Sequence, residues 1–395
     1  MLSQLVKPEV QAFILEHTGS DLTRLLLNKN KYPTIPMDLV VDQIRAREKA
    51  KHKIPLWVNT EGVVMPPLLS MEQCSSEQTA TYKASLFGGK TCVDLTGGTG
   101  VDTYCLSKRF NEVHYIEQNH QLAEIARYNF ELLGARNIIV HTKTSEQFLA
   151  DFNLKVDLIY IDPSRRDQQN KVFNFELCSP NVLPMQNELL QRAEKVMVKA
   201  SPMIDISLGI KQLLHVTRIH VVALKNEVKE LLFVQQNKSS TETLIKAIDL
   251  SIPGPFEFIH GSQNAPDIAP VKKYLYEPNA AIMKSGGVNW LSHHYPIQKL
   301  HENTHLFTSN TLIASFPGRS FKIESVVKYN KKEIRRAVTG SKANVSVRNF
   351  PDTVDTFRKK TGLRSGGEIY VFGYTGPYNN VEIAICKKVL FQEDL

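Results

Sequence analysis

The pattern of apolar and polar residues changes character near residue 85. Before this point apolar residues recur at helical spacing, and prolines interrupt the pattern. The helical stretches are residues 9–17, 21–28 and 37–51. Ser75, followed three residues later by Gln78, fits a capping box at the start of a further helix. We therefore expect a helical N-terminal domain over residues 1–84, which serves as a lid or a docking unit.

From residue 91 onward, short apolar runs alternate with amphipathic stretches of helical spacing. The runs are residues 91–96, 112–119, 137–142, 156–164, 195–202, 217–226 and 230–237. Strand–helix alternation with nearly continuous apolar strands predicts a parallel sheet covered on both faces. The last two runs are too close for a helical crossover, so they should form an antiparallel hairpin at the sheet edge. The predicted fold class is α/β, with a Rossmann-like, seven-stranded, mostly parallel sheet over residues 85–255.

The chain after this sheet predicts smaller units. A stretch rich in Pro and Gly, residues 251–270, indicates a boundary. We expect a small α+β segment over residues 256–317. Residues 318–395 then show the order strand, helix, strand, helix and a closing hairpin, which predicts a second small α+β domain.

Composition adds a basic C-terminal end to this picture. The whole chain of 395 residues has a formal net charge of +8, with an apolar share that is ordinary for a globular protein. Residues 318–395 alone carry 15 Lys and Arg against 8 Asp and Glu. A local excess of this kind indicates a polyanionic partner.

Several classes of protein are disfavoured by the sequence. The first residues lack the basic head and apolar core of a secretory leader. No apolar stretch reaches the roughly 18–20 residues that a membrane-spanning helix needs. The five cysteines form no C-x-x-C pair, and the pair His293–His294 has no matching ligands, so neither a disulfide framework nor a metal site is expected. We expect a reduced, cytoplasmic protein that acts without a membrane or a metal.

The first junction between a strand and a helix carries the strongest motif. Residues 94–100, Asp-Leu-Thr-Gly-Gly-Thr-Gly, place glycines where the backbone must turn tightly and approach a ligand. Thr103 stands where the dinucleotide fingerprint needs its third glycine, so NAD is disfavoured. The motif instead resembles the first motif of class I S-adenosylmethionine-dependent methyltransferases. Glu117 follows about twenty residues later at the end of the second run, where an acid meets ribose hydroxyls in such sheets.

We therefore expect S-adenosylmethionine as the cofactor. Ser145 and Glu146, after the third run, are weaker candidates for contacts with the adenine. The candidate cofactor-binding residues are Asp94, Thr96, Gly97, Gly98, Thr99, Gly100, Asp102, Glu117, Ser145 and Asp162.

The fourth run ends in a segment that should face the methyl group, because ligands bind beyond the carboxyl ends of such strands. Its residues are Asp162, Pro163, Ser164, Arg165 and Arg166. The segment lies where nucleic-acid amino-methyltransferases carry Asp/Asn-Pro-Pro-aromatic, a motif that accepts hydrogen bonds from the amine. Here Ser164 replaces the second proline and Arg165 replaces the stacking aromatic residue.

We consider all five residues of this segment candidate catalytic residues, with Asp162 orienting the acceptor. The two arginines either hold the nucleotide or form salt bridges with Asp167 or Glu176. Lys199 ends the fifth run at the same edge, and we interpret it as a solvated lysine rather than a substrate ligand.

Larger blocks of sequence resemble one bacterial family. SSEQTATYKA, DLTGGTGVDT, YIEQN, YIDPSRRD and VKASPMIDI, together with the later YEPNAAIMKSGG and ANVSVRNFP, are similar to class I methyltransferases that carry a ferredoxin-like segment and a C-terminal THUMP-like domain. The chain also looks distantly similar to ribosomal-RNA guanine-N2 methyltransferases. The resemblance implies a ferredoxin-like segment over residues 256–317 and a THUMP-like domain over residues 318–395.

Because THUMP domains bind RNA, the resemblance also implies a tRNA or rRNA substrate. The expected RNA contacts are Lys328, Lys331, Lys332, Arg335, Arg336, Lys342 and Arg348, with Arg358, Lys359 and Lys360 nearby. The leading hypothesis is methylation of a base nitrogen in RNA. The alternatives are a non-catalytic protein that binds cofactor and RNA, and a methyltransferase that acts on a protein or a small molecule.

Overall fold

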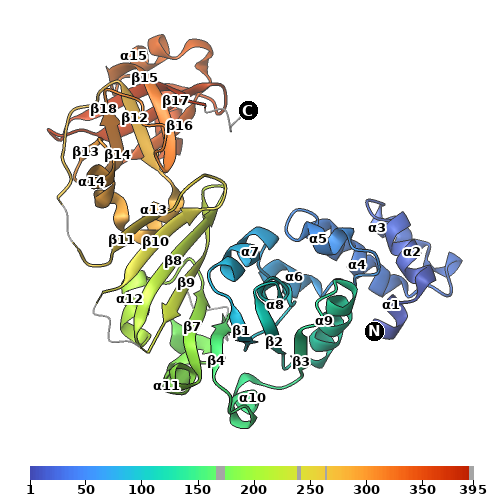
Figure 1. The fold of residues 1–395 in the computed structure, drawn as a ribbon. Coiled ribbons are helices and arrows are strands. Elements are labelled where there is room, and N and C mark those ends of the chain that lie inside the picture. The colour runs from blue at the N-terminus through green and yellow to red at the C-terminus, as the bar shows by residue number, and fades with distance from the viewer. Residues whose placement is uncertain (166–173, 238–241, 263–264, 391–395) are drawn as a thin grey trace. The chain divides into compact units, whose positions relative to one another are not determined.

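The computed structural model describes residues 1–165, 174–237, 242–262 and 265–390 (Figure 1). The chain divides into two compact units, residues 1–219 with 229–241 and residues 220–228 with 242–395. The hairpin of strands β8 (Val216–Leu224) and β9 (Glu227–Gln235) runs through both units, and its tip belongs to the second.

A nine-stranded sheet carries the predicted α/β fold. Its strands are β1 (Gly89–Asp94), β2 (Phe110–Ile116), β3 (Ile138–His141), β4 (Val156–Ile161), β7 (Ala193–Ala200), β8 (Val216–Leu224), β9 (Glu227–Gln235), β10 (Leu244–Asp249) and β11 (Phe256–Ile259). Their order is β11–β10–β8–β9–β7–β4–β1–β2–β3. The seven predicted strands are confirmed, but β10 and β11 extend the sheet. The prediction that the β8–β9 hairpin forms the sheet edge was therefore wrong.

The strand directions create a binding crevice. β1 pairs in parallel with β2 and β4, β2 with β3, and β4 with β7, whereas β9 is antiparallel to β7. The chain places β2 and β3 on one side of β1 and then returns to the other side with β4. Such a reversal of strand order opens a crevice at the carboxyl ends of the strands, where ligands bind in open α/β sheets.

The helices that flank the sheet begin at polar N-cap residues, except for the first, which begins at Gly100. They are α8 (Val101–Ser107), α9 (His120–Leu132), α10 (Ser145–Asp151), α11 (Val182–Arg192) and α12 (Ile206–Gln212). Asn119 caps α9, and Thr144 forms a capping box with Gln147 at α10. α8 and α9 lie against β2 and β3, and α11 lies against β7.

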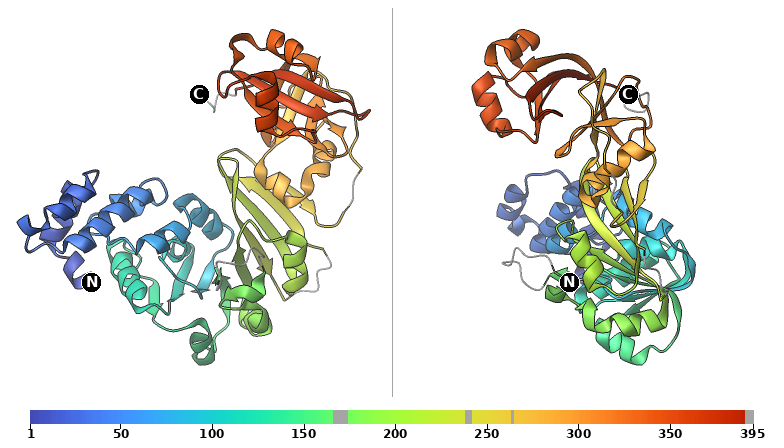
Figure 2. Two further views of the ribbon diagram at one scale, coloured as in Figure 1. Left: turned by 180° about the vertical axis from the view of Figure 1, so that it is seen from behind. Right: turned by 90° about the vertical axis from the view of Figure 1, so that its left-hand side faces the viewer.

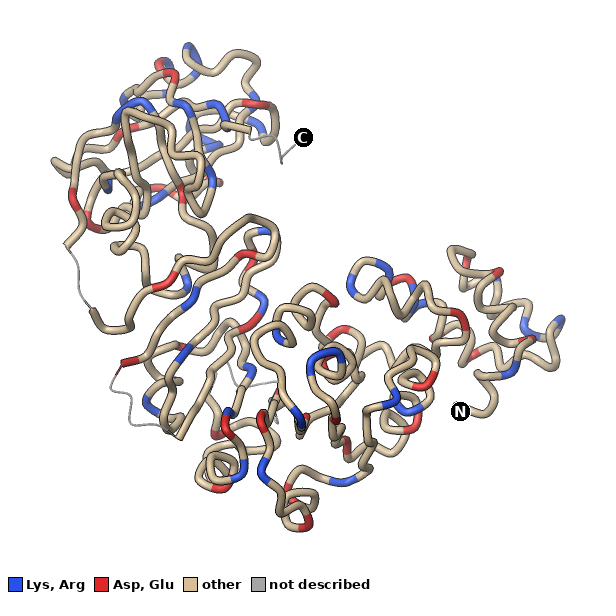
Figure 3. The backbone as a smooth tube through the Cα atoms, in the orientation of Figure 1, with Lys and Arg blue, Asp and Glu red and all other residues tan. Residues whose placement is uncertain are grey.

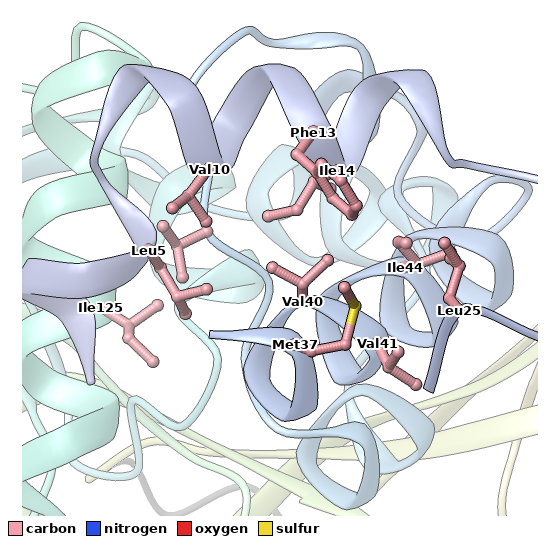
Figure 4. Close-up of a cluster of buried hydrophobic side chains, with 11 residues drawn as sticks. Leu5, Val10, Phe13, Ile14, Leu25, Met37, Val40, Val41, Ile44 and Ile125 are labelled. Atoms are coloured by element: carbon pink, nitrogen blue, oxygen red, sulfur yellow. The ribbon is translucent and has the colours of Figure 1, made fainter. Parts of the chain in front are cut away.

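The predicted N-terminal helices are confirmed. They are α1 (Leu2–Leu5), α2 (Pro8–Glu16), α3 (Leu22–Leu27), α4 (Met37–Ala50), α5 (Pro55–Asn59), α6 (Leu68–Gln73) and α7 (Glu77–Ser85). The apolar faces of α1 to α4 pack around residues such as Ile14 and Val40. Ile125 of α9 joins this cluster, so these four helices share a core with the layer that covers the sheet (Figures 2 and 4). The cap of α7 is Ser76 rather than the predicted Ser75. None of the helices in the described residues is both long and apolar enough to cross a membrane.

The second unit contains a seven-stranded sheet of its own. Its strands are β12 (Tyr274–Pro278), β13 (Gln298–His301), β14 (Thr304–Ser309), β15 (Gly318–Lys328), β16 (Asn344–Arg348), β17 (Ile369–Thr375) and β18 (Val381–Lys388), in the order β13–β14–β12–β15–β18–β17–β16. Its helices are α13 (Ala280–Ser285), α14 (Leu291–His294), α15 (Lys331–Ala337) and α16 (Val354–Thr361). The predicted element order after residue 318 is confirmed. Because β15 pairs with both β12 and β18, one sheet joins the segments before and after residue 318.

Candidate active site

A cavity of about 800 Å³ lies in the first unit, at the carboxyl ends of its five parallel strands. β1, β2 and β7 contribute residues to the wall directly, and the segments that follow β3 and β4 contribute the rest of this edge. The predicted residues that line the cavity are Asp94, Thr96, Gly97, Gly98, Thr99, Asp102, Glu117, Ser145, Glu146, Asp162, Pro163, Ser164 and Lys199. The sequence-predicted cofactor and transfer residues thus meet in one cavity, although they are far apart along the chain.

The glycine loop packs tightly on the sheet and leaves space toward the cavity. A Cβ atom at Gly97 would lie 2.2 Å from the ring of Tyr115, which packs beneath the loop and donates a hydrogen bond to the carbonyl of Gly98 at 2.6 Å. Gly98 has a φ of 54°, and a Cβ atom there would lie 3.7 Å from the carbonyl oxygen of Thr96, an ordinary van der Waals contact. Gly100, outside the cavity wall, begins α8 with a left-handed conformation and packs on Phe130. The loop can therefore accept a ligand against bare backbone.

Glu117 holds the glycine loop in place. Its Oε2 accepts a hydrogen bond from the Gly98 N–H at 2.9 Å, and its Oε1 accepts one from the Asn119 N–H at 2.7 Å. Each carboxylate oxygen has a further lone pair, so both can also accept hydrogen bonds from a diol in the cavity.

Asp94 ends β1 in a buried position. Its Oδ1 accepts a hydrogen bond from the Thr96 N–H at 3.0 Å, and its Oδ2 accepts one from the Thr103 hydroxyl at 2.6 Å. Burial raises the pKa of Asp94 to about 7, although these two hydrogen bonds act to lower it. Thr103, which replaces the glycine of a dinucleotide fingerprint, therefore donates a hydrogen bond to the acid at the start of the loop.

Two hydroxyl groups tie the glycine loop to its neighbours. Thr96 Oγ1 accepts a hydrogen bond from the backbone N–H of Asp162 at 2.6 Å, which links the loop to the transfer segment. Ser145 Oγ donates to the carbonyl of Leu95 at 2.7 Å. Ser145 thus supports the loop, besides lining the cavity.

The transfer segment is only partly described. Asp162, Pro163 and Ser164 line the cavity, and Ser164 with the backbone of Arg165 forms the short strand β5 (Ser164–Arg165), antiparallel to β6 (Cys178–Ser179). Arg166 lies outside the described residues.

Lys199 forms an ion pair with Asp162. Its Nζ lies 2.5 Å from Asp162 Oδ2, and the lysine side chain is only 12% exposed. The interpretation of Lys199 as a solvated lysine was therefore wrong, because the ends of neighbouring strands β4 and β7 bring a carboxylate beside it.

A buried cluster of polar side chains beside the cavity joins Asp102, a predicted cofactor-binding residue, to partners that were not predicted from the sequence. Lys83 of α7 contacts both carboxylate oxygens of Glu230 in β9 at 2.7 Å, and Asp102 Oδ1 lies 3.3 Å from the same ammonium group. Asp102 Oδ2 accepts hydrogen bonds from Ser75 and Tyr160, each at 2.8 Å. Burial alone would raise the pKa of Asp102, but the nearby Lys83 and Lys199 lower it below its usual value. The cluster fixes the first turn of α8 next to the cavity.

The N-terminal helical segment also forms part of the cavity wall. Its contributions come from the end of α6 and the link to α7, and they are Ser70, Gln73, Cys74 and Ser75. This segment therefore helps to build the site.

The predicted RNA contacts of the second unit fall into two groups. Six of them are exposed, namely Lys328, Lys331, Lys332, Arg335, Arg336 and Lys342. Arg348 instead forms an ion pair with the buried Glu277, which Arg319 also contacts. Figure 3 shows Lys and Arg distributed over this unit, including helix α15.

Comparison with known proteins gives the family. The crystal structure of a candidate methyltransferase from Porphyromonas gingivalis W83 is 30% identical to this chain, and the match covers 98% of this chain and 99% of that one with a TM-score of 0.88. The chain belongs to this methyltransferase family. Residues 274–317 match a ferredoxin-like domain, residues 318–388 match a family described as THUMP domain-like, and residues 78–209 match conserved hypothetical protein 95. The resemblance and the fold class inferred from the sequence are thus confirmed.

Other solved structures match only part of the chain. A candidate methyltransferase from Streptococcus mutans in complex with SAH is 16% identical, with 40% of this chain and 96% of that one covered and a TM-score of 0.32. An rRNA methylase from Streptococcus thermophilus is 14% identical, with 40% and 95% covered and a TM-score of 0.31. No protein with a curated description matches the chain.

Proposed function

We propose that the protein is an S-adenosylmethionine-dependent methyltransferase that methylates a base nitrogen in tRNA or rRNA. One observation carries this proposal: a single cavity is lined by the glycine loop, by Glu117 at the end of β2 and by Asp162 at the end of β4. The family membership supports methyl transfer, and the THUMP-like match supports RNA as the substrate class.

The cavity has the shape and the chemistry that this cofactor needs. Its volume of about 800 Å³ falls in the range of pockets for small molecules and cofactors. Glu117 is proposed to bind a ribose diol, and the absence of a side chain at Gly98 leaves the backbone of the loop accessible to the ligand. The wall contains five acidic side chains and three lysines, and this excess of acidic groups favours a ligand that carries positive charge.

Asp162 and Pro163 are proposed to orient the acceptor nitrogen. The cofactor supplies an activated methyl group, whose bond to sulfur breaks with the electron pair staying on sulfur while a bond forms to the nitrogen. The protein therefore has mainly to position the nitrogen, through hydrogen bonds to the Asp162 carboxylate and to backbone carbonyls of the segment. The nitrogen then loses one proton to solvent.

The exposed cations of the second unit are proposed to dock the RNA. Helix α15 presents four of them within seven residues, and Lys359 and Lys360 of α16 are also exposed. Clustered Lys and Arg neutralise phosphates and release counterions, so binding should weaken as salt rises. Arg348 is a poorer candidate than the rest, because Glu277 already occupies its guanidinium group.

Transfer of a labelled methyl group tests the proposal. The purified full-length protein is incubated with methyl-labelled S-adenosylmethionine and total RNA from cells that lack it. We expect label in RNA that ribonuclease releases, and mass spectrometry of nucleosides should then show an N-methylated base. Asp162→Ala should lose transfer while it still binds the cofactor.

Other outcomes of the same experiment would contradict the proposal. Label that survives ribonuclease would indicate a protein or small-molecule substrate. Cofactor binding without transfer to any RNA would indicate a non-catalytic binding protein.

Charge-removing substitutions on α15 test RNA docking better than deletion of residues 318–395, because that deletion would remove β15, a pairing partner of β12.

A further inference from the structure

A chain of buried polar contacts runs from the N-terminal helices to the transfer segment. The Ser75 hydroxyl oxygen lies 3.0 Å from Lys83 Nζ and 3.4 Å from Lys199 Nζ, and it donates a hydrogen bond to Asp102. Lys199 Nζ in turn lies 2.5 Å from Asp162 Oδ2. A single serine therefore joins the lysine anchored in α7 to the lysine that holds the transfer carboxylate.

Lys199 is a fixed cation in this arrangement. Burial would lower the pKa of Lys199, but the carboxylates of Asp162, Glu230 and Asp102 act against burial and raise it above its usual value. A lysine that keeps its proton cannot remove one from an acceptor nitrogen. Its effect on the reaction must therefore be electrostatic and geometric.

Within the described part of the chain, the Asp162 carboxylate is held on one side only. Its Oδ2 is bound by Lys199, and its backbone N–H is bound by Thr96. Among the described residues no group donates a hydrogen bond to Oδ1, and the side chain is 34% exposed in the cavity wall. One oxygen is thus fixed by the protein, and the other can accept a hydrogen bond from a ligand.

We propose that Lys199 is a positioning residue, which holds the Asp162 carboxylate so that Oδ1 accepts a hydrogen bond from the acceptor nitrogen. Ser75, in the segment before α7, fixes the ammonium group of Lys199. The inference rests on the proposed function and deepens it, since the N-terminal helical segment then contributes Ser75 to the transfer site.

The geometry explains why an anchored lysine is used here. A free lysine side chain has many rotamers, and burial next to Ser75 and Asp162 removes that freedom. Without the ammonium group the carboxylate can rotate, and a displacement of about 1 Å in a reacting geometry can slow a reaction about 100-fold.

Four variants test the proposal in the full-length protein. Lys199→Met removes the cation, Lys199→Arg restores charge with a different shape, and Ser75→Ala removes only the bridging hydroxyl. Lys195→Met is the matched control, because Lys195 lies on the same face of β7, four residues away, pairs with Glu194 and is absent from the cavity wall. The readouts are calorimetric binding of S-adenosylhomocysteine, and kcat and KM for transfer to RNA at saturating cofactor.

Lys199→Met should bind S-adenosylhomocysteine within about threefold of the wild type and transfer methyl groups about 100-fold more slowly. The loss should appear in kcat rather than in the KM for RNA, because a misdirected carboxylate slows transfer without weakening RNA docking. Ser75→Ala and Lys199→Arg should fall between Lys199→Met and the wild type, and Lys195→Met should match the wild type.

The outcomes separate this inference from the proposed function. Transfer by Lys199→Met within about threefold of the wild type, or a loss confined to the KM for RNA, would overturn the positioning role and leave the function intact. A wild type that binds S-adenosylhomocysteine but transfers to no RNA would overturn both. Circular dichroism of each variant excludes loss of folding as the cause of a slow reaction.

Discussion

Replacement of Asp94 by asparagine tests the buried carboxyl group at the end of β1. Burial raises the pKa of Asp94 to about 7 from its usual value of 3.8. Between these values the folded protein keeps a proton that the unfolded chain has lost, so the free energy of unfolding falls as pH rises through this window. From pH 5 to pH 8 the fall amounts to about 3 kcal/mol, since each pH unit below the raised pKa contributes about 1.4 kcal/mol. An asparagine does not titrate, and it can keep the hydrogen bonds to Thr96 and Thr103.

The difference in free energy of unfolding between Asp94→Asn and the wild type should therefore shift by about 3 kcal/mol in favour of the variant as pH rises from 5 to 8. Urea unfolding measures this with Trp57 as the reporter, because its buried ring contacts Tyr104 of α8, the helix after the glycine loop. The chain has two tryptophans, so Trp290→Phe in every protein leaves Trp57 alone. The control Asp38→Asn removes an exposed carboxylate from α4. Its difference from the wild type in free energy of unfolding should change by no more than about 0.5 kcal/mol over the same pH range. A difference for Asp94→Asn that is the same at every pH would refute the reasoning.

Three further predictions concern other contacts. Lys83→Met should lower the free energy of unfolding by about 3–5 kcal/mol, because it leaves the buried Glu230 without its cation. Urea unfolding should show partial recovery of stability when Glu230→Gln is added. No recovery would contradict the proposed energetic coupling of the two residues. Gly97→Ala should abolish calorimetric binding of S-adenosylhomocysteine, since its Cβ would lie 2.2 Å from the Tyr115 ring and displace the loop; binding at wild-type strength would contradict this. Replacement of the four cations of residues 331–336 by glutamine should make the plot of log affinity for RNA against log salt concentration less steep by about 3. An unchanged slope in filter binding would show that α15 does not contact the RNA.

The parts of this protein that the sequence predicts well follow from local patterns. Strands buried on both faces must be nearly continuous in apolar residues, which made the seven strands of the first sheet recognisable. The glycine loop was recognisable because Gly98 needs a positive φ and Gly97 cannot carry a Cβ against Tyr115. The order of strands in such a fold then brings Glu117 and Asp162 to one edge.

The parts that the sequence does not predict depend on contacts between distant residues. Lys83 and Glu230 are 147 residues apart, and nothing local in either segment marks them as partners. Lys199 looks like a solvated strand-end lysine until the neighbouring strand supplies Asp162. Ser75 and Ser76 both precede α7, and only the packing of the helix shows which one caps it.

Calorimetric titration of the full-length protein with S-adenosylhomocysteine examines the cofactor cavity itself. We expect saturable one-to-one binding with a dissociation constant in the micromolar range, and loss of that binding in Gly97→Ala. Absence of saturable heat at two temperatures, from protein that circular dichroism shows to be folded, would contradict the assignment of this cavity.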